Sequence, residues 1–148
     1  MNRRPRAALL LVAVLALLSV SCSKDEDSSG GDGTGGGGGV GVTLADYSVT
    51  LDSTSLSAGD VTFNVTNDAG QVHEFVVVKT DLAEDALPLV EGDVDEESTE
   101  ISPVDEIEDI EPGTSPSLAV TLEAGSYVAL CNLPGHYGQG MHAAFTVA

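Results

Sequence analysis

The sequence predicts an all-β domain, a sandwich or barrel, over residues 40–148, and three observations support this fold class. Several short segments alternate apolar and polar residues with the period of two that is typical of strands. Clusters of Gly, Asn and Asp separate these segments, as in proteins built from short strands joined by turns. One further segment, 127–131, is apolar on both faces, which indicates a central strand that is covered on both sides.

The expected strands follow one another along the chain with turns between them. Val61, Phe63 and Val65 share one face of an alternating segment, and later segments repeat this pattern. Turns are expected at 67–70 and 123–126, where Asn, Asp, Glu, Ser and Gly gather. The expected strands cover residues 42–51, 61–66, 72–79, 117–122, 127–131 and 142–147.

Residues 81–113 break this pattern, because they are acidic and contain several prolines. Their first part, 81–89, is expected to form a short helix with its apolar residues on one side. The part from 91 to 111 carries most of the charge and few large apolar side chains, so we expect a solvated loop across one edge of the sandwich. A surface on which a partner docks is the alternative interpretation.

The N-terminus indicates export. Residues 1–21 resemble a secretory signal peptide, with a basic start and an apolar run that is short for a membrane-spanning helix. Cys22 comes directly after this segment, as does the cysteine that carries the lipid anchor in bacterial lipoproteins. The alternative is an ordinary secretory signal without a lipid anchor. Residues 22–39, mostly Gly, Ser and Asp, are expected to be a flexible linker. We therefore expect a protein of the cell envelope or periplasm, lipid-anchored to the outer face of the cytoplasmic membrane.

The charge of the chain limits its partners. The chain has 5 Lys+Arg and 24 Asp+Glu, which gives a formal net charge of −19. Nucleic acid is excluded as a partner because phosphate binding depends on Lys and Arg. The acidity favours a basic protein partner, which long-range attraction would steer, and the alternative is that it only keeps the protein soluble.

A cluster of metal-ligand residues lies near the C-terminus. Cys131, His136 and Met141 follow one another in the loop between the last two expected strands. His73 lies far upstream, on the expected strand 72–79, at the parity of the core residue Phe75. One thiolate, two imidazoles and a weak axial thioether form a ligand set that suits both Cu(I) and Cu(II).

Each of these residues also has an ordinary interpretation when it is taken alone. A histidine on an apolar strand face, a buried cysteine and a buried methionine are all common in protein cores. Their joint spacing predicts a copper site. Zinc is less suited to this set, because methionine is a poor zinc ligand.

This pattern resembles the cupredoxins, the small blue-copper proteins of the plastocyanin/azurin superfamily, with a ligand loop of the rusticyanin and auracyanin type. The resemblance implies a Greek-key β-sandwich of about eight strands that holds one copper ion, Cu(I)/Cu(II). It implies His73, Cys131 and His136 as equatorial ligands and Met141 as the axial ligand. It also implies an apolar patch that serves as the electron port. In this chain, the expected patch residues are Leu133, Pro134 and Tyr137.

Two residues depart from the family pattern. Glu74 stands where several members have Asn or Ser bonding towards the ligand loop, and Val72 stands where azurins have glycine. These departures concern the surroundings of the metal and its reduction potential.

The function expected from this resemblance is that of a monomeric one-electron carrier. Its partner would be a redox protein, possibly basic, such as a cytochrome c-like protein or an oxidase. Copper storage, delivery or oxidase assembly is the alternative. An enzyme is not expected, because His142 is the one histidine left over, and we expect it on the surface.

Overall fold

The computed structural model describes residues 39–148. The expected signal peptide, Cys22 and all of the expected linker except Gly39 lie outside the described residues. Among the described residues, no helix has the length and apolar character needed to cross a membrane.

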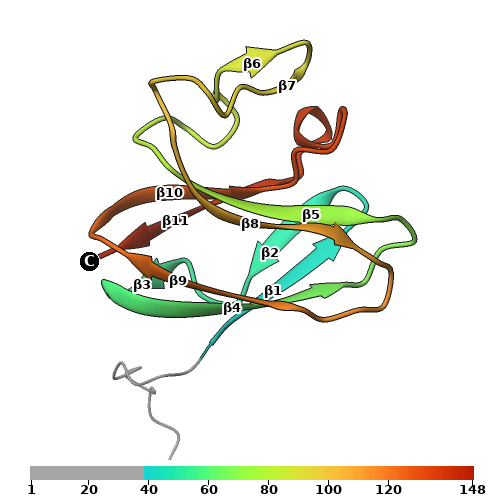
Figure 1. Ribbon diagram of the computed structural model, residues 1–148, viewed down its shortest axis with the longest axis horizontal. Coiled ribbons are helices and arrows are strands. Elements are labelled where there is room, and N and C mark those ends of the chain that lie inside the picture. Colours follow the sequence, from blue (N-terminus) through green and yellow to red (C-terminus); the bar gives the residue numbers. More distant parts are fainter. Residues whose placement is uncertain (1–38) are drawn as a thin grey trace, which may run out of the picture. The chain divides into compact units, whose positions relative to one another are not determined.

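One sheet of the structure has four strands in the order β2-β1-β4-β9 (Figure 1). Strands β1 and β2 form an antiparallel hairpin, β1 runs parallel to β4, and β4 runs antiparallel to β9. Their side chains alternate between the core and solvent, as the sequence pattern predicts. The bounds are β1 (Val40–Ala45), β2 (Ser48–Leu51), β4 (Gly59–Asn67) and β9 (Ser117–Leu122).

The second sheet has five strands in the order β3-β11-β10-β5-β8. Connections β4–β5, β8–β9 and β9–β10 each pass from one sheet to the other, which gives the expected Greek-key β-sandwich. The bounds are β3 (Ser55–Leu56), β5 (His73–Lys79), β8 (Ser102–Ile110), β10 (Gly125–Leu130) and β11 (His142–Val147). A separate hairpin, β6 (Leu89–Val90) with β7 (Asp93–Val94), and a 3-10 turn, η1 (Tyr137–Gln139), complete the described elements.

The main core lies between the two sheets. Phe63 from β4 packs its ring against Phe75 of β5 and Phe145 of β11, at centroid distances of 5.4 and 5.7 Å. Valines and leucines from both sheets surround these rings and are buried. Burial of this apolar surface drives the two sheets together, and it fixes the register of each strand because a one-residue slip would expose the apolar face.

The other face of the five-stranded sheet is also covered, and here the sequence prediction was wrong. Residues 80–101, which we call the strap, do not form the expected helix, and although most of their side chains face solvent, the strap packs on the sheet through a few buried apolar residues. The strap lies across the side of the sheet that faces away from β4 and β9 (Figure 1). Its buried apolar residues are Leu87, Val94 and Ile101, with Leu82 partly buried.

The strap covers this face because β5 and β10 are apolar on both sides. Val76 and Val78 of β5, with Val128 and Leu130 of β10, point away from the main core and pack against the strap. An uncovered face of this kind would expose a large apolar patch to water. The rest of the expected loop is also ordered, since it contains the nine-residue edge strand β8.

Candidate metal centre

His73 and Cys131 lie at the ends of neighbouring strands of the five-stranded sheet. Strand β5 begins with His73, and the antiparallel strand β10 ends at Leu130, directly before Cys131. The two side chains therefore meet at one end of the sandwich. Both residues are completely buried, with 0% of their surface exposed.

Backbone hydrogen bonds fold the loop 131–141 back on itself. The Cys131 N–H donates to the Met141 carbonyl at 3.0 Å, and the Met141 N–H donates to the His136 carbonyl at 3.3 Å. Gly135 and Gly140 have φ angles of 78° and 102°, a left-handed region that glycine adopts without strain. The loop thereby returns His136 to the side of Cys131.

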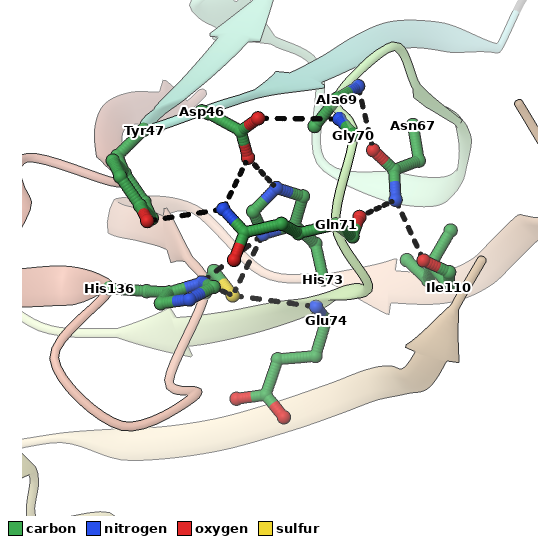
Figure 2. A network of polar contacts seen from close by, with 11 residues as sticks. Asp46, Tyr47, Asn67, Ala69, Gly70, Gln71, His73, Glu74, Ile110 and His136 are labelled. Carbon is green, nitrogen blue, oxygen red and sulfur yellow. Dashed lines mark hydrogen bonds and ion pairs between the residues drawn. The ribbon is translucent and has the colours of Figure 1, made fainter. Parts of the chain in front are cut away.

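Three ligand atoms converge at this point. The Cys131 Sγ lies 3.4 Å from the His136 Nδ1 and 3.8 Å from the His73 Nδ1, and the two Nδ1 atoms are 3.2 Å apart. Figure 2 shows the two imidazoles close together, with His136 below and to the left of His73 in this view. Within residues 39–148, this is the one group of three or more His, Cys, Asp or Glu residues whose ligand atoms are close enough to share a metal ion.

Polar groups around the cluster hold its members in place. The His73 Nε2 lies 3.1 Å from the Asp46 Oδ1, on the far side of the ring from Cys131. The Glu74 N–H donates to the Cys131 Sγ at 3.4 Å, and the Glu74 carboxylate accepts from the Asn132 N–H at 2.6 Å. Glu74, which directly follows His73, therefore bonds both to the ligand Cys131 and to the next residue, Asn132.

Burial changes the protonation of these groups. It raises the pKa of the Cys131 thiol, while the N–H donors of Glu74 and Leu133 partly offset this effect. Burial and then the neighbouring His73 lower the pKa of His136, which keeps its imidazole neutral and able to donate a lone pair. Burial also raises the pKa of the Glu74 carboxyl to about 7.

The donor set fits a copper ion. Two neutral imidazoles and one sulfur form the trigonal set that copper uses in electron-transfer sites. The Glu74 N–H directed at the Cys131 Sγ would stabilise a thiolate, and the Asp46 carboxylate stands behind His73 as second-sphere carboxylates do in metal sites. His73, Cys131 and His136 are therefore positioned to bind one copper ion.

Met141 is close to this cluster in the fold but its ligand role stays a prediction. It is completely buried, and its backbone bonds to both Cys131 and His136. Met141 is the last residue of the ligand loop, directly before β11.

Two residues expected at the surface are enclosed by the strap. Tyr137 was expected in an exposed patch, but it is 5% exposed because its hydroxyl accepts from the Leu87 N–H and donates to the Glu84 carbonyl. His142 was expected on the surface, but its side chain is 14% exposed and its ring lies 5.0 Å from that of Tyr137. Of the other patch residues, Leu133 is half-buried and Pro134 is exposed.

The strap bonds directly to the ligand loop. The Asn132 side chain accepts from the Val94 N–H at 2.7 Å and donates to the Val94 carbonyl at 3.0 Å. The Gly135 N–H donates to the Asp93 carboxylate at 2.8 Å. Together with Tyr137, these contacts involve the residue after Cys131 and the residues on either side of His136.

Sequence reasoning missed Asp46 and Tyr47, which form the turn between β1 and β2. The Tyr47 ring packs edge-on against His136 at 5.0 Å, beside the contact of Asp46 with His73. The sequence contained a signal for this turn, because the large apolar residues change from even-numbered positions, as at Leu44, to odd-numbered positions, as at Val49. This change of parity marks a turn inside the segment that was expected to be one strand.

A Greek-key sandwich with a His-Cys-His cluster at one end, two of its three members completely buried, defines a copper-binding β-protein. A family model described as copper binding proteins, plastocyanin/azurin family, matches residues 40–148. The chain belongs to this family.

The solved structures that resemble the chain agree with this assignment at the level of the fold. Reduced auracyanin from Roseiflexus castenholzii is 24% identical, with a TM-score of 0.53, covering 73% of this chain and 94% of its own. Auracyanin A, described as a "blue" copper protein from Chloroflexus aurantiacus, is 24% identical with a TM-score of 0.52, covering 75% and 100%. Reduced rusticyanin is 18% identical with a TM-score of 0.52, covering 73% and 76%. No curated protein matches the chain by sequence.

Proposed function

We propose that this protein is a one-electron carrier of the type 1, blue-copper kind. The observation that carries the proposal is the pre-arranged cluster of His73, Cys131 and His136, whose ligand atoms already lie within 4.8 Å of one another. When bound there, copper would supply reversible one-electron chemistry between Cu(I) and Cu(II). A ligand set that is held by the fold needs little rearrangement when the charge of the metal changes.

The surroundings of the three ligands support a carrier. Two of them are completely buried and fixed by hydrogen bonds, which keeps water away from the site. His136 is partly exposed, beside the half-buried Leu133 and the exposed Pro134. We therefore propose that electrons enter and leave through the His136 edge, with Leu133 and Pro134 forming the port and Tyr137 supporting it from within.

Met141 is proposed as the axial ligand. Its position next to the ligand loop and its complete burial support this role, because a thioether in a dry site can approach a metal that it binds only weakly. A Met141→Leu variant is then expected to keep copper but to shift its reduction potential.

The cellular setting belongs to the same proposal. The sequence of residues 1–22 supports export with a lipid anchor at Cys22, and the formal net charge of −19 supports a basic redox partner. The proposal includes no enzymatic reaction. The third histidine, His142, packs against Tyr137 rather than in the cluster.

The experiment that tests the carrier function compares electron exchange with metal loss. The copper-loaded protein is reduced with ascorbate and reoxidised with ferricyanide over repeated cycles, in the presence of a Cu(I) chelator. A carrier is expected to return the full Cu(II) signal each cycle while the chelator stays colourless. Transfer of copper to the chelator at each reduction would refute the proposal and favour storage or delivery.

A further inference from the structure

We propose that Asp46 is a positioning residue for the copper site, acting through His73. The inference rests on the His73, Cys131 and His136 site and extends the proposed function by naming the group that sets one ligand's tautomer and basicity. Asp46 lies in the turn between β1 and β2, which belongs to the other sheet from His73. The contact therefore joins the two sheets at the end of the sandwich where the ligands meet.

The contact with Asp46 determines which ring nitrogen of His73 carries the proton. The His73 Nε2 is 3.1 Å from the Asp46 Oδ1, and the ring itself is completely buried. An ionised carboxylate only accepts hydrogen bonds, so the neutral ring must carry its proton on Nε2. The Nδ1 lone pair is then directed at the Cys131 Sγ and the His136 Nδ1, as a metal ligand requires.

Asp46 is itself held in orientation, as Figure 2 shows. Its Oδ2 accepts from the Gly70 N–H at 3.3 Å, and its Oδ1 accepts from the Gln71 side chain, also at 3.3 Å. The same Gln71 amide donates to the Tyr47 hydroxyl at 3.1 Å. The loop between β4 and β5 therefore holds both oxygens of the carboxylate, including the Oδ1 that faces His73.

That loop is anchored in turn by a buried amide. The Asn67 side chain donates to the carbonyls of Gln71 and Ile110 at 2.8 and 2.7 Å, and it accepts from the Ala69 N–H at 2.9 Å. Asn67 is completely buried, and its bond to the Ile110 carbonyl is buried as well, which shields that bond from competing water. The chain of contacts runs from a rigid interior group through the loop and Asp46 to the metal ligand.

The negative charge of Asp46 is expected to lower the reduction potential of copper at this site. A negative carboxylate behind the imidazole increases the electron donation of Nδ1 and stabilises Cu(II) more than Cu(I). Removing the charge while keeping the acceptor should raise the reduction potential. Removing the acceptor should also loosen the ring and weaken copper binding by about 10- to 100-fold, the usual effect of losing such a partner.

Three variants separate these effects. Asp46→Asn keeps an acceptor oxygen for the Nε2 proton but loses the charge. Asp46→Ala loses both. Asp68→Asn is the matched control, because Asp68 is an exposed carboxylate on the neighbouring loop and its side chain makes no hydrogen bond to the described residues.

The first measurement uses the copper-free protein. Nitrogen-15 NMR of the histidine side chains reports which ring nitrogen of His73 carries the proton. The proposal predicts the Nε2–H form in the unmodified protein and in Asp68→Asn, and a mixture of tautomers in Asp46→Ala. The same single tautomer in Asp46→Ala would overturn the proposal, whether or not the protein proves to carry electrons.

The second measurement uses the copper-loaded protein. Asp46→Asn is expected to have a higher reduction potential with little change in copper affinity. Asp46→Ala is expected to bind copper about 10- to 100-fold more weakly. Asp68→Asn should change neither the potential nor the affinity by a comparable amount. Equal potentials and affinities in Asp46→Ala and Asp68→Asn would also overturn the proposal. A wild-type protein that binds no copper would refute the copper site itself, and the tautomer measurement would still decide the role of Asp46.

Discussion

Tyr137→Phe tests whether the strap depends on its bonds to the ligand loop. This change removes one hydroxyl from a residue that is 5% exposed and leaves its ring in place. The hydroxyl accepts from the Leu87 N–H at 3.0 Å and donates to the Glu84 carbonyl at 2.8 Å. These two bonds attach the first part of the strap to Tyr137, the residue that follows His136.

The size of the effect follows from the two bonds. Each buried hydrogen bond contributes about 1 kcal/mol net, and the Leu87 N–H would be left buried without a partner, which costs about 1–3 kcal/mol. We expect the free energy of unfolding to fall by about 2 kcal/mol in total. Urea denaturation of the copper-free protein measures this loss, and hydrogen exchange of the amides in residues 80–101 locates it.

A second tyrosine provides the control. The Tyr127 hydroxyl donates to the Glu123 carbonyl at 2.8 Å, so its partner does not belong to the strap. Tyr127→Phe loses one bond only, so we expect a loss of about 1 kcal/mol and no faster exchange in the strap. Equal losses in the two variants, with unchanged exchange at the Leu87 amide, would refute the view that Tyr137 holds the strap.

Three further predictions concern the core, the carboxylates of the edge strand β8 and the metal site. Phe63→Ala should lower the free energy of unfolding by about 3–5 kcal/mol, as measured by urea denaturation, because it opens a cavity among the core rings. Glu106→Gln should raise the free energy of unfolding at pH 7, because burial and then neighbouring carboxylates raise the pKa of Glu106, so that its charged form opposes folding. Glu106 is an exposed residue and water screens its charge, which limits the gain to at most about 1 kcal/mol, measured by urea denaturation. This gain should shrink as the pH falls towards 4.5, the ordinary value at which the unfolded chain also becomes protonated, and a gain that grows on acidification would contradict it. Copper at 1,000 times its dissociation constant should stabilise the protein by about 4 kcal/mol, and thermal melting should show no such gain in His73→Ala.

Much of the sandwich follows from local patterns in the sequence. The expected strands at 117–122 and 142–147 coincide with β9 and β11, because alternation and adjacent turns act over a few residues. The cluster of His73, Cys131 and His136 is also predictable, since His73 and Cys131 lie at the ends of neighbouring expected strands and His136 lies in the short loop that follows Cys131.

The strap could not be predicted in the same way. Its buried residues Leu87, Val94 and Ile101 are spaced by seven residues and lie among acidic residues, without the period of a strand. They are buried because the outer face of β5 and β10 needs a cover, which is a property of the assembled sheet. The burial of Tyr137 and His142 follows from that cover, so it was missed for the same reason.

Asp46 illustrates a different limit. Its neighbour in space is His73, which is 27 residues away in the chain and lies in the other sheet. No local pattern relates the two residues. Only the pairing of β1 with β2 and the packing of the sheets bring the carboxylate behind the imidazole.

The visible absorption spectrum after addition of Cu(II) tests the copper site most directly. Cys131→Ala removes the one sulfur of the His73, Cys131 and His136 cluster, and Cys22→Ala is the matched control because it removes the chain's other cysteine. We predict an intense thiolate-to-copper charge-transfer band that ascorbate bleaches, that persists in Cys22→Ala and that is absent in Cys131→Ala. A colourless protein, or a band that survives in Cys131→Ala, would contradict the assignment of the copper site.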